Sequence, residues 1–324
     1  MSIDYRQIPL HAIPSPYDPR NYTVSMFSPV LMDLPNEYIS PYIPEVQDQF
    51  LTSMCVAYTL ASLKEMQELK ERKIRTRYSP GFIYGNRLDT DHQGEGMHVH
   101  QGLHKLLKDG VCAFTDYQTR GSYSACKNGL RNKPHLYELA KPQVIKSYVR
   151  INMKNNDEIK TAIYKWDGVP IVVAINDSFY RANGNKGLVP DVEQNDIVRG
   201  YHAMLAVGWK KISGRYYWIV VNSWGKSWGD KGYCYIPFNY SAIIEGWSVV
   251  DDVIDEAEYI KMLIPMTMIS DRTMLGFRDV YAALGAQIEW NQATQTARAI
   301  IPPSNKTITI ETKLGSNVMK ILRT

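Results

Sequence analysis

Two polar side chains near residue 50 could support acyl-transfer chemistry. Cys55 follows a turn-rich segment with prolines at 35, 41 and 44, and it precedes an apolar, helix-compatible segment, residues 56–66. At a helix N-terminus, unpaired N–H groups and the positive end of the helix dipole favour a thiolate over a thiol. Gln49 lies six residues earlier, and its amide could hydrogen-bond the negative charge that develops on a carbonyl oxygen.

A lone cysteine before a helix is usually a small buried hydrophobic residue, so the evidence for chemistry must come from elsewhere in the chain. His202 begins a strand-like apolar run, and Asn222 ends a second such run before a series of Trp and Gly turns. Thiol, imidazole and amide in this order supply a nucleophile, its general base and a group that orients the base.

In these three blocks the chain resembles the papain-like cysteine peptidases of the C1 family. The matching residues are Val46, Asp48, Gln49, Cys55, Ala57, His202-Ala203, Val207-Gly208, Asn222-Ser223-Trp224-Gly225, Trp228-Gly229 and Gly232-Tyr233. The separations from Cys55 are 202 − 55 = 147 and 222 − 55 = 167 residues; the first lies within the ~130–150 typical of the family, and the second is slightly longer. Two departures, Thr52 in place of a half-cystine and Val56 in place of an aromatic residue, affect subsite shape rather than the reacting groups.

The resemblance implies a function and a set of site residues. We expect a cysteine endopeptidase that hydrolyses peptide or protein substrates through an acyl-enzyme thioester. Its catalytic residues would be Cys55, His202 and Asn222, Gln49 would hold the oxyanion, and Trp224 would shield the His202–Asn222 hydrogen bond from water. Further candidates for substrate binding are Gly94, Gly96 and Tyr201.

The resemblance also implies an α+β fold of two lobes, a helical left lobe and a β-barrel-like right lobe, over residues 41–250. Periodicity predicts a central helix over 55–71, strands over 144–151 and 170–175, and a short amphipathic helix over 156–166. This arrangement would place Cys55 and His202 on opposite walls of a cleft.

Four histidines, at 92, 98, 100 and 104, raise the question of a metal site. His100 and His104 would share one face of a helix, but no HExxH pattern and no paired cysteines lie nearby. A solvated or packed histidine face is therefore the favoured interpretation, and we predict no metal and no cofactor. The other cysteines, at 112, 126 and 234, fit a reducing compartment, although a Cys112–Cys126 disulfide is conceivable.

Residues 1–40 are rich in Pro and Tyr and predict an extended arm packed on the body of the protein. A sharper alternative is a short pro-segment that interacts with the cleft of its own chain until it is removed. The first residues lack the layout of a signal peptide, and no window has the ~18 apolar residues of a membrane span, so we expect a cytoplasmic protein by default. The net charge of +4 is mild and makes nucleic acid an unlikely partner class.

The composition changes after residue 250. Residues 251–260 form an acidic linker, and residues 261–324 resemble the copper amine oxidase N-terminal-like (stalk) domain. The matching residues are Arg278, Leu284-Gly285-Ala286, Trp290 and Gly315-Ser316. This stretch contains no His or Cys, so no copper is expected. The resemblance implies a partner in a cell envelope or phage structure, and hence a virion-associated or released protein.

Two further functions fit the same residues. The triad could run acyl transfer or amidation in place of hydrolysis. Alternatively, the chain is a non-catalytic or structural peptide-binding protein of a cell envelope or phage particle, with a relic site.

Overall fold

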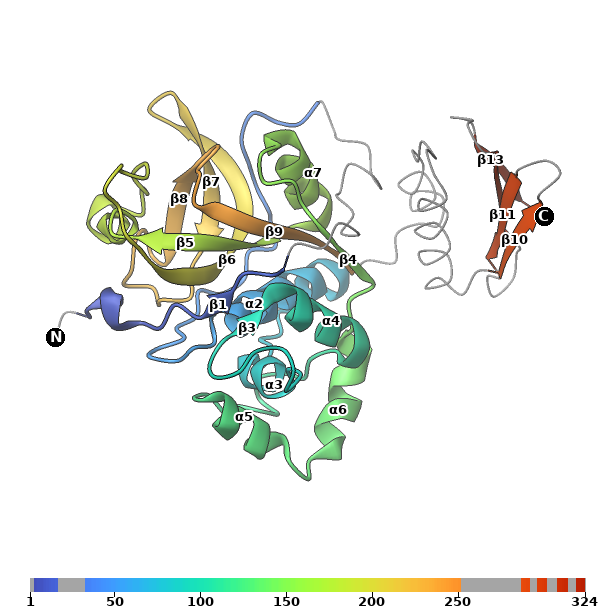
Figure 1. Ribbon diagram of the computed structural model, residues 1–324, viewed down its shortest axis with the longest axis horizontal. Coiled ribbons are helices and arrows are strands. Elements are labelled where there is room, and N and C mark those ends of the chain that lie inside the picture. The colour runs from blue at the N-terminus through green and yellow to red at the C-terminus, as the bar shows by residue number, and fades with distance from the viewer. Residues whose placement is uncertain are drawn as a thin grey trace. The chain divides into compact units, whose positions relative to one another are not determined.

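The computed structural model describes residues 3–16 and 33–251 with their side chains, and the backbone of four strands between residues 287 and 323 (Figure 1). The chain divides into two units, one of residues 1–24 and 30–253 and one of residues 25–29 and 254–324. All the predicted site residues belong to the first unit. Within the described residues, no helix is both long and apolar enough to cross a membrane.

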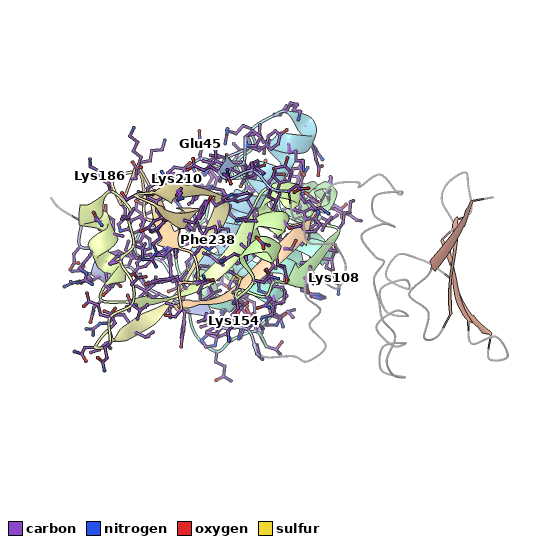
Figure 2. All side chains as sticks on the ribbon, turned by 90° about the horizontal axis from the view of Figure 1, so that it is seen from above. Glu45, Lys108, Lys154, Lys186, Lys210 and Phe238 are labelled. Atoms are coloured by element: carbon purple, nitrogen blue, oxygen red, sulfur yellow. The ribbon has the colours of Figure 1, made fainter. Side chains whose placement is uncertain are left out.

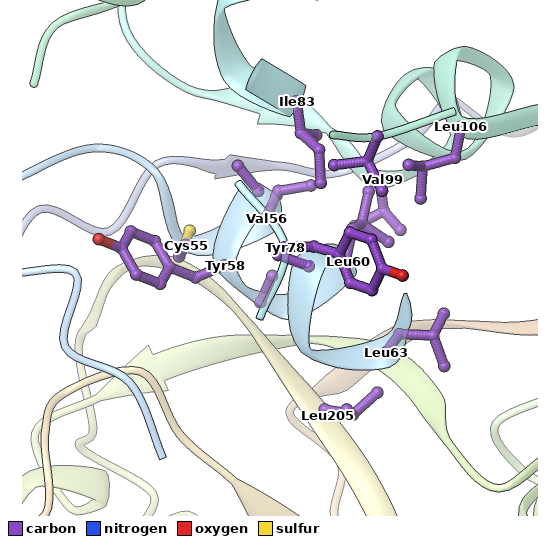
Figure 3. Close-up of a cluster of buried hydrophobic side chains, with 14 of the residues drawn as sticks. Cys55, Val56, Tyr58, Leu60, Leu63, Tyr78, Ile83, Val99, Leu106 and Leu205 are labelled. Carbon is purple, nitrogen blue, oxygen red and sulfur yellow. The ribbon is translucent and has the colours of Figure 1, made fainter. Parts of the chain in front are cut away.

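The helical lobe is built around α2 (Cys55–Arg72), which confirms the helix predicted over 55–71. Every residue from Cys55 to Glu68 is buried, so the helix lies inside the protein instead of on its surface. Figure 3 shows Val56, Leu60 and Leu63 on this helix packed among apolar side chains from neighbouring segments. The helix is capped at its C-terminus by Lys73, which adopts the left-handed conformation and donates its N–H to the Leu69 carbonyl.

Short helices surround α2 in the same lobe. They are α3 (Pro80–Gly85), α4 (Val99–Asp109), α5 (Tyr123–Leu130) and α6 (Pro134–Ala140). Ser79 caps α3 by accepting a hydrogen bond from the Phe82 N–H, and Pro80 occupies the first helical position, where its missing N–H costs nothing. Ser122 caps α5 in the same way through the Ala125 N–H.

The second lobe is an antiparallel sheet. In the order β4-β9-β5-β6-β7-β8 its strands are Ser147–Arg150, Ile243–Val250, Val169–Asn176, Val198–Ile212, Arg215–Val221 and Tyr233–Pro237, and β2 (Tyr38–Ile39) also pairs with β6. The two-lobed α+β fold is confirmed, and among the described residues the sheet of the second lobe is not closed into a barrel. Strands β4 and β8 end the path without pairing with each other.

Helix α7 (Asn156–Trp166) packs on β5, β6 and β9 and has the predicted bounds. Asn155 caps it, and Asp157 and Glu158 lie in its first turn, where negative charge is favoured. Figure 2 draws the side chains of the first unit, with Lys108 on the helical side and Lys210 and Phe238 on the strand side. The predicted strands over 144–151 and 170–175 are confirmed as β4 and β5.

The two lobes meet where α2 packs against β6 and β5. Two side chains of α2 reinforce this contact at its far end. The buried Lys64 ammonium pairs with the Asp251 carboxylate, and the Gln67 amide donates to the Val249 carbonyl at 3.1 Å. At its other end, Cys55, the first residue of α2, lies beside the backbone of Ala203 in β6.

The N-terminal segment is extended and follows the junction of the lobes (Figure 1). It contains a short 3₁₀ turn, η1 (Tyr5–Gln7), and the two-residue strand β1 (Ala12–Ile13). Strand β1 pairs in parallel with β3 (Met97–His98), which belongs to the helical lobe. Residue His11 also bridges to Tyr201 of β6, so the segment contacts both lobes.

The second unit contains a four-stranded antiparallel meander. Its strands are β10 (Gln287–Asn291), β11 (Thr296–Ile301), β12 (Ile308–Lys313) and β13 (Met319–Arg323). The acidic linker predicted over residues 251–260 lies, beyond its first residue, outside the described residues.

Candidate active site

The loop before Cys55 is joined to the segment after Asn222 by paired backbone and side-chain hydrogen bonds. The Gln49 N–H donates to the Ser223 carbonyl at 2.8 Å, and the Gly225 N–H donates to the Gln47 carbonyl at 3.1 Å. The Ser223 hydroxyl donates to Gln49 Oε1 at 2.7 Å. These contacts position the loop before Cys55, in the helical lobe, against the turn that follows β7.

His202 and Asn222 are joined directly. His202 Nε2 lies 2.7 Å from Asn222 Oδ1, which also accepts from the Ser223 N–H at 2.8 Å. Because the amide oxygen can only accept, the proton is assigned to Nε2, which leaves a lone pair on Nδ1. Nδ1 is buried and has no hydrogen-bond partner among the described residues. An oriented imidazole with a free basic nitrogen is what a general base requires.

Trp224 covers this pair. Its ring lies 4.8 Å from the His202 ring, centroid to centroid, at an interplanar angle of 35°. On its other sides it stacks on Tyr180 and contacts Phe179 and Trp228 edge-on. His202, Asn222 and Trp224 are all at most 2% exposed, so their hydrogen bond lies in a low-dielectric environment where it is stronger than in water.

Cys55 is the first residue of α2 and is fully buried. Burial raises the pKa of its thiol, and backbone hydrogen bonds from Ala203, Val56 and His11 oppose this only in part. Burial also lowers the pKa of His202 to about 4, although the Asn222 hydrogen bond acts in the opposite direction. In this conformation the thiol and the imidazole are therefore both neutral, because desolvation outweighs the helix-terminus effect that favours a thiolate.

The N-terminal segment contributes to the burial of Cys55, because Ala12 belongs to the same buried cluster. The His11 backbone lies close enough to Cys55 to oppose the rise in the pKa of its thiol, and His11 Nδ1 lies 2.7 Å from the Ser53 hydroxyl. On the strand side the Tyr201 N–H donates to the Leu10 carbonyl at 3.4 Å, and on the helical side the Met97 N–H donates to the His11 carbonyl at 3.3 Å. We call residues 3–16 the arm.

The structure separates the three candidates for substrate binding. Gly96 lies against the arm, since a Cβ there would come within 2.4 Å of the His11 carbonyl oxygen. Tyr201 also contacts the arm through its N–H. Gly94 does not, because a Cβ there would meet nothing within 4 Å.

Gln49 is fully buried, and its amide is already engaged. Its Nε2 donates to the Thr52 carbonyl at 2.8 Å, while its Oε1 accepts from Ser223. The amide is thereby held in one orientation beside the loop that ends in Cys55.

The histidines of the helical lobe have other partners. His98 Nδ1 lies 2.5 Å from Asp91 Oδ1, and His100 Nδ1 lies 2.9 Å from the Ser15 hydroxyl of the arm. His104 is exposed on α4. All four cysteines are free and buried.

Sequence patterns missed His11 of the arm and two residues that the arm contacts, Ser53 and Glu245. His11, Ser53 and Glu245 are isolated polar residues in unremarkable segments, and only their long-range contacts distinguish them. A lone acidic residue within the apolar run of β9 was the one available signal for Glu245.

Comparison with known families agrees with this geometry. The model of the papain family cysteine proteases matches residues 36–246. The model of the copper amine oxidase N-terminal domain matches residues 253–323, a stretch that contains no His or Cys.

Individual proteins show the same similarity. The chain is 28% identical over 210 residues to Peptidase 1 of Psoroptes ovis and 24% identical over 202 residues to the viral cathepsin of Heliothis zea nuclear polyhedrosis virus, covering 63% and 62% of this chain. The chain spans 61% and 51% of the lengths of these two relatives.

Among solved structures, xylellain, a cysteine protease from Xylella fastidiosa, superposes with a TM-score of 0.66 at 21% identity. The match covers 78% of this chain and all of that one, and it shows that the fold is papain-like. Because the model of the papain family matches well over half of this chain, residues 36–246, the chain belongs to the papain family of cysteine proteases.

Proposed function

We propose that the protein is a cysteine endopeptidase that hydrolyses peptide bonds with Cys55, His202 and Asn222. The observation that supports this most directly is the 2.7 Å contact between His202 Nε2 and Asn222 Oδ1, which leaves a buried, unpartnered Nδ1. Such a nitrogen is suited to accept the thiol proton of Cys55. Membership of the family supports peptides or proteins as the substrate class.

The reaction follows from the roles of these groups. His202 Nδ1 takes the proton from Cys55 Sγ, and the thiolate attacks the carbonyl carbon of the scissile bond. The Cys55 N–H and the Gln49 amide then hold the oxyanion, for which Gln49 Nε2 must be shared with or released from Thr52. His202 returns the proton to the leaving amine, and water hydrolyses the thioester to release the acid and restore the thiol.

The arm functions, in this proposal, as a pro-segment. The His11 backbone lies on the Cys55 sulfur, and the contacts of the arm with Tyr201 and Met97 fill the space between the lobes that a substrate must enter. The neutral Cys55–His202 pair is a second reason to expect low peptidase activity while the arm is in place, because a thiolate, not a thiol, is the attacking group. Displacement of the arm would return water to the site and relieve the desolvation that keeps both groups neutral.

Labelling of the native full-length protein with an epoxide inhibitor of thiol proteases tests this proposal. We expect slow modification of Cys55, read by mass spectrometry, and much faster modification after removal of residues 1–16. His202→Ala should abolish labelling in both forms, while His104→Ala, which alters an exposed histidine, should not. Cys55 that stays unmodified in both forms would refute an activated nucleophile.

A non-catalytic peptide-binding protein is the second candidate. It is favoured by one observation: within the described residues, no hydrogen bond joins Cys55 to His202, and a peptide segment, the arm, occupies the site. The same labelling experiment distinguishes the two, because a binding protein would take up a peptide in place of the arm without modification of Cys55.

The C-terminal domain, in this proposal, attaches the peptidase to a cell-envelope or virion-associated assembly. Its match to a separate family over residues 253–323 supports a role distinct from catalysis. We expect the full chain to sediment with envelope or particle fractions and a chain of residues 1–251 to stay in the supernatant. If both chains sediment to the same extent, the C-terminal domain is not the attachment site.

A further inference from the structure

A buried arginine holds the loop that precedes β3. Arg87 follows the C-cap of α3 and is 5% exposed. Its guanidinium donates to three alternate carbonyls of the loop: to Gly96, to Gly94 at 2.5 Å and to His92 at 3.1 Å. In the described part of the chain, no carboxylate forms an ion pair with it. The loop is therefore wrapped around a single cation, and the rigid fork of donors in a guanidinium is suited to this.

Glycines and two neighbouring helices give the loop its shape. Gly94 and Gly96 have φ angles of 96° and 103°, a region in which glycine carries no steric penalty. The Tyr84 hydroxyl of α3 accepts from the Gly96 N–H at 2.7 Å and donates to the Glu95 carboxylate at 2.7 Å. Glu95 also accepts from the Tyr123 N–H of α5 at 3.1 Å. The backbone of Gly96 is therefore bound on both its N–H and its carbonyl by side chains from the interior of the lobe.

The peptide group between Gly96 and Met97 connects Arg87 to the cleft. Its carbonyl accepts from Arg87, and its N–H donates to the His11 carbonyl of the arm at 3.3 Å. The C=O and N–H of a trans peptide lie in one plane and point in opposite directions. The guanidinium on one side therefore fixes the direction of the N–H on the other. A charged donor on the carbonyl also polarises the peptide, which makes its N–H a stronger donor.

This N–H lies where a substrate must bind. Strand β1 of the arm pairs in parallel with β3, and the two lie side by side (Figure 1). The next N–H of β3, that of His98, lies 3.4 Å from the Asp91 carboxylate of its own lobe, so Met97 supplies the donor for the arm. The His11 backbone also lies beside Cys55. A peptide that replaces the arm and brings a carbonyl to Cys55 therefore has a neighbouring carbonyl within reach of the Met97 N–H, since residues advance ~3.3 Å each along an extended chain.

From this geometry we propose that Arg87 is a positioning residue, which orients the Gly96–Met97 peptide so that its N–H binds the backbone of the substrate. The proposal rests on the proposed peptidase function and adds to it a residue outside the triad. A carbonyl of the substrate takes the place of the His11 carbonyl. Because the contact is with the backbone, Arg87 contributes to the binding of peptides whatever their side chains.

A merely structural role for Arg87 predicts something different. A buried cation whose removal only loosens the loop would alter the stability of the protein and the hold on the arm. Both changes affect every reagent that reaches Cys55 to the same extent. A positioning role instead affects reagents with a peptide backbone more than reagents without one, so the ratio of the two rates separates the roles.

The test measures the rates at which two chloromethyl ketones modify Cys55 in the full-length protein. One is acetyl-diglycyl chloromethyl ketone, which has backbone amides and no side chains, and the other has an alkyl chain of the same length without amides. Both are long enough to require displacement of the arm, so the cost of that step and the reactivity of the thiolate divide out of the ratio. In Arg87→Met the ratio of peptidyl to alkyl reagent should fall roughly tenfold, as for the loss of one hydrogen bond strengthened by charge.

Two further variants complete the test. Tyr117→Phe is the control, because it removes a buried hydrogen bond to the Cys126 carbonyl, 2.6 Å long, elsewhere in the same lobe. Its ratio should equal that of the wild type. Arg87→Lys keeps the positive charge but replaces the fork by a single ammonium, and its ratio should fall by a smaller factor, roughly three. This milder change carries the test if Arg87→Met does not fold.

The outcomes are distinct. A wild-type ratio in Arg87→Met, or in Arg87→Lys if only that variant folds, would overturn the positioning role. An equal fall in Tyr117→Phe would also overturn it, because the ratio would then report a general loosening of the lobe. If neither reagent modifies Cys55 in the wild type, before or after removal of the arm, the proposed peptidase function itself is refuted, and this inference with it.

Discussion

His11 Nδ1 lies 2.7 Å from Ser53 Oγ, a contact that joins the arm to the loop that ends in Cys55 two residues later. Neither residue belongs to the predicted triad, yet their contact helps to place the His11 backbone on the Cys55 sulfur. Hydrogen bonds of this kind contribute about 1 kcal/mol, so the arm is held by several modest contacts, each of which can be tested.

Loss of the His11 side chain should speed modification of Cys55. His11→Ala removes the hydrogen bond to Ser53, and a net loss of about 1 kcal/mol corresponds to a roughly fivefold larger population with the arm displaced. The rate of epoxide labelling measures this. His104→Ala is the matched control, and a wild-type rate in His11→Ala would show that the contact does not restrain the arm.

Gly96 and Gly94 form a matched pair for the contact between arm and cleft. Both have positive φ angles, 103° and 96°, so alanine adds similar backbone strain at either position. Only at Gly96 would the new Cβ meet the His11 carbonyl oxygen, at 2.4 Å. We therefore expect Gly96→Ala to raise the rate of Cys55 modification by iodoacetamide well above that of Gly94→Ala. Equal rates would contradict the arm's route past Gly96.

Gln49→Ala should reduce turnover of the arm-free enzyme by roughly a hundredfold, as expected for the loss of one oxyanion donor worth about 3 kcal/mol. The effect should appear in kcat with a peptide substrate. Ser223→Ala is the control, because it removes the partner of Gln49 Oε1 but keeps the donor amide. A Gln49→Ala enzyme with full activity would remove Gln49 from the mechanism.

The stability of the arm-covered protein should fall with acid because of His202. Its pKa is lowered from 6.5 to about 4, so between these values the folded protein binds fewer protons than the unfolded chain. The contribution of His202 to the free energy of unfolding is fully present above pH 6.5. It is lost as the pH falls towards 4, and the total loss is about 3 kcal/mol.

Urea unfolding of the full-length protein at pH 7 and pH 4 measures this contribution. His202→Gln should lose less stability on acidification than the wild type, because it cannot gain the proton. His104→Gln should behave as the wild type does. An identical acid response in wild type and His202→Gln would mean that His202 is not held neutral by burial.

The Lys64–Asp251 pair should be essential to the junction of the lobes. Both side chains are at most 4% exposed, and Lys64 also pairs with Glu68. Lys64→Met would leave buried carboxylates without their cation, and we expect a loss of about 3–5 kcal/mol in the free energy of unfolding. Lys127→Met, which breaks an exposed pair with Asp89, should leave the urea midpoint almost unchanged. If Lys64→Met and Lys127→Met have similar urea midpoints, burial does not make the Lys64–Asp251 pair more important to stability than the exposed pair.

The amino-acid sequence was sufficient to predict the family, the papain-like fold and the principal elements. Helices α2 and α7 and strands β4 and β5 follow from periodic apolar patterns and from caps such as Asn155. The blocks around Cys55, His202 and Asn222 could be recognised because catalysis restricts residue type and order over short stretches. Their roles stay predictions, although the structure brings His202, Asn222 and Trp224 into contact.

Only the tertiary structure decided what surrounds these residues. The route of the arm, the difference between Gly96 and Gly94 and the open sheet all depend on contacts between distant segments. The burial of Cys55, which reverses the expected thiolate, likewise involves a distant segment, since Ala12 of the arm belongs to the same buried cluster as Cys55. Such contacts leave no local pattern in the sequence, because a single hydrogen bond constrains one residue at each end and imposes no periodicity between them.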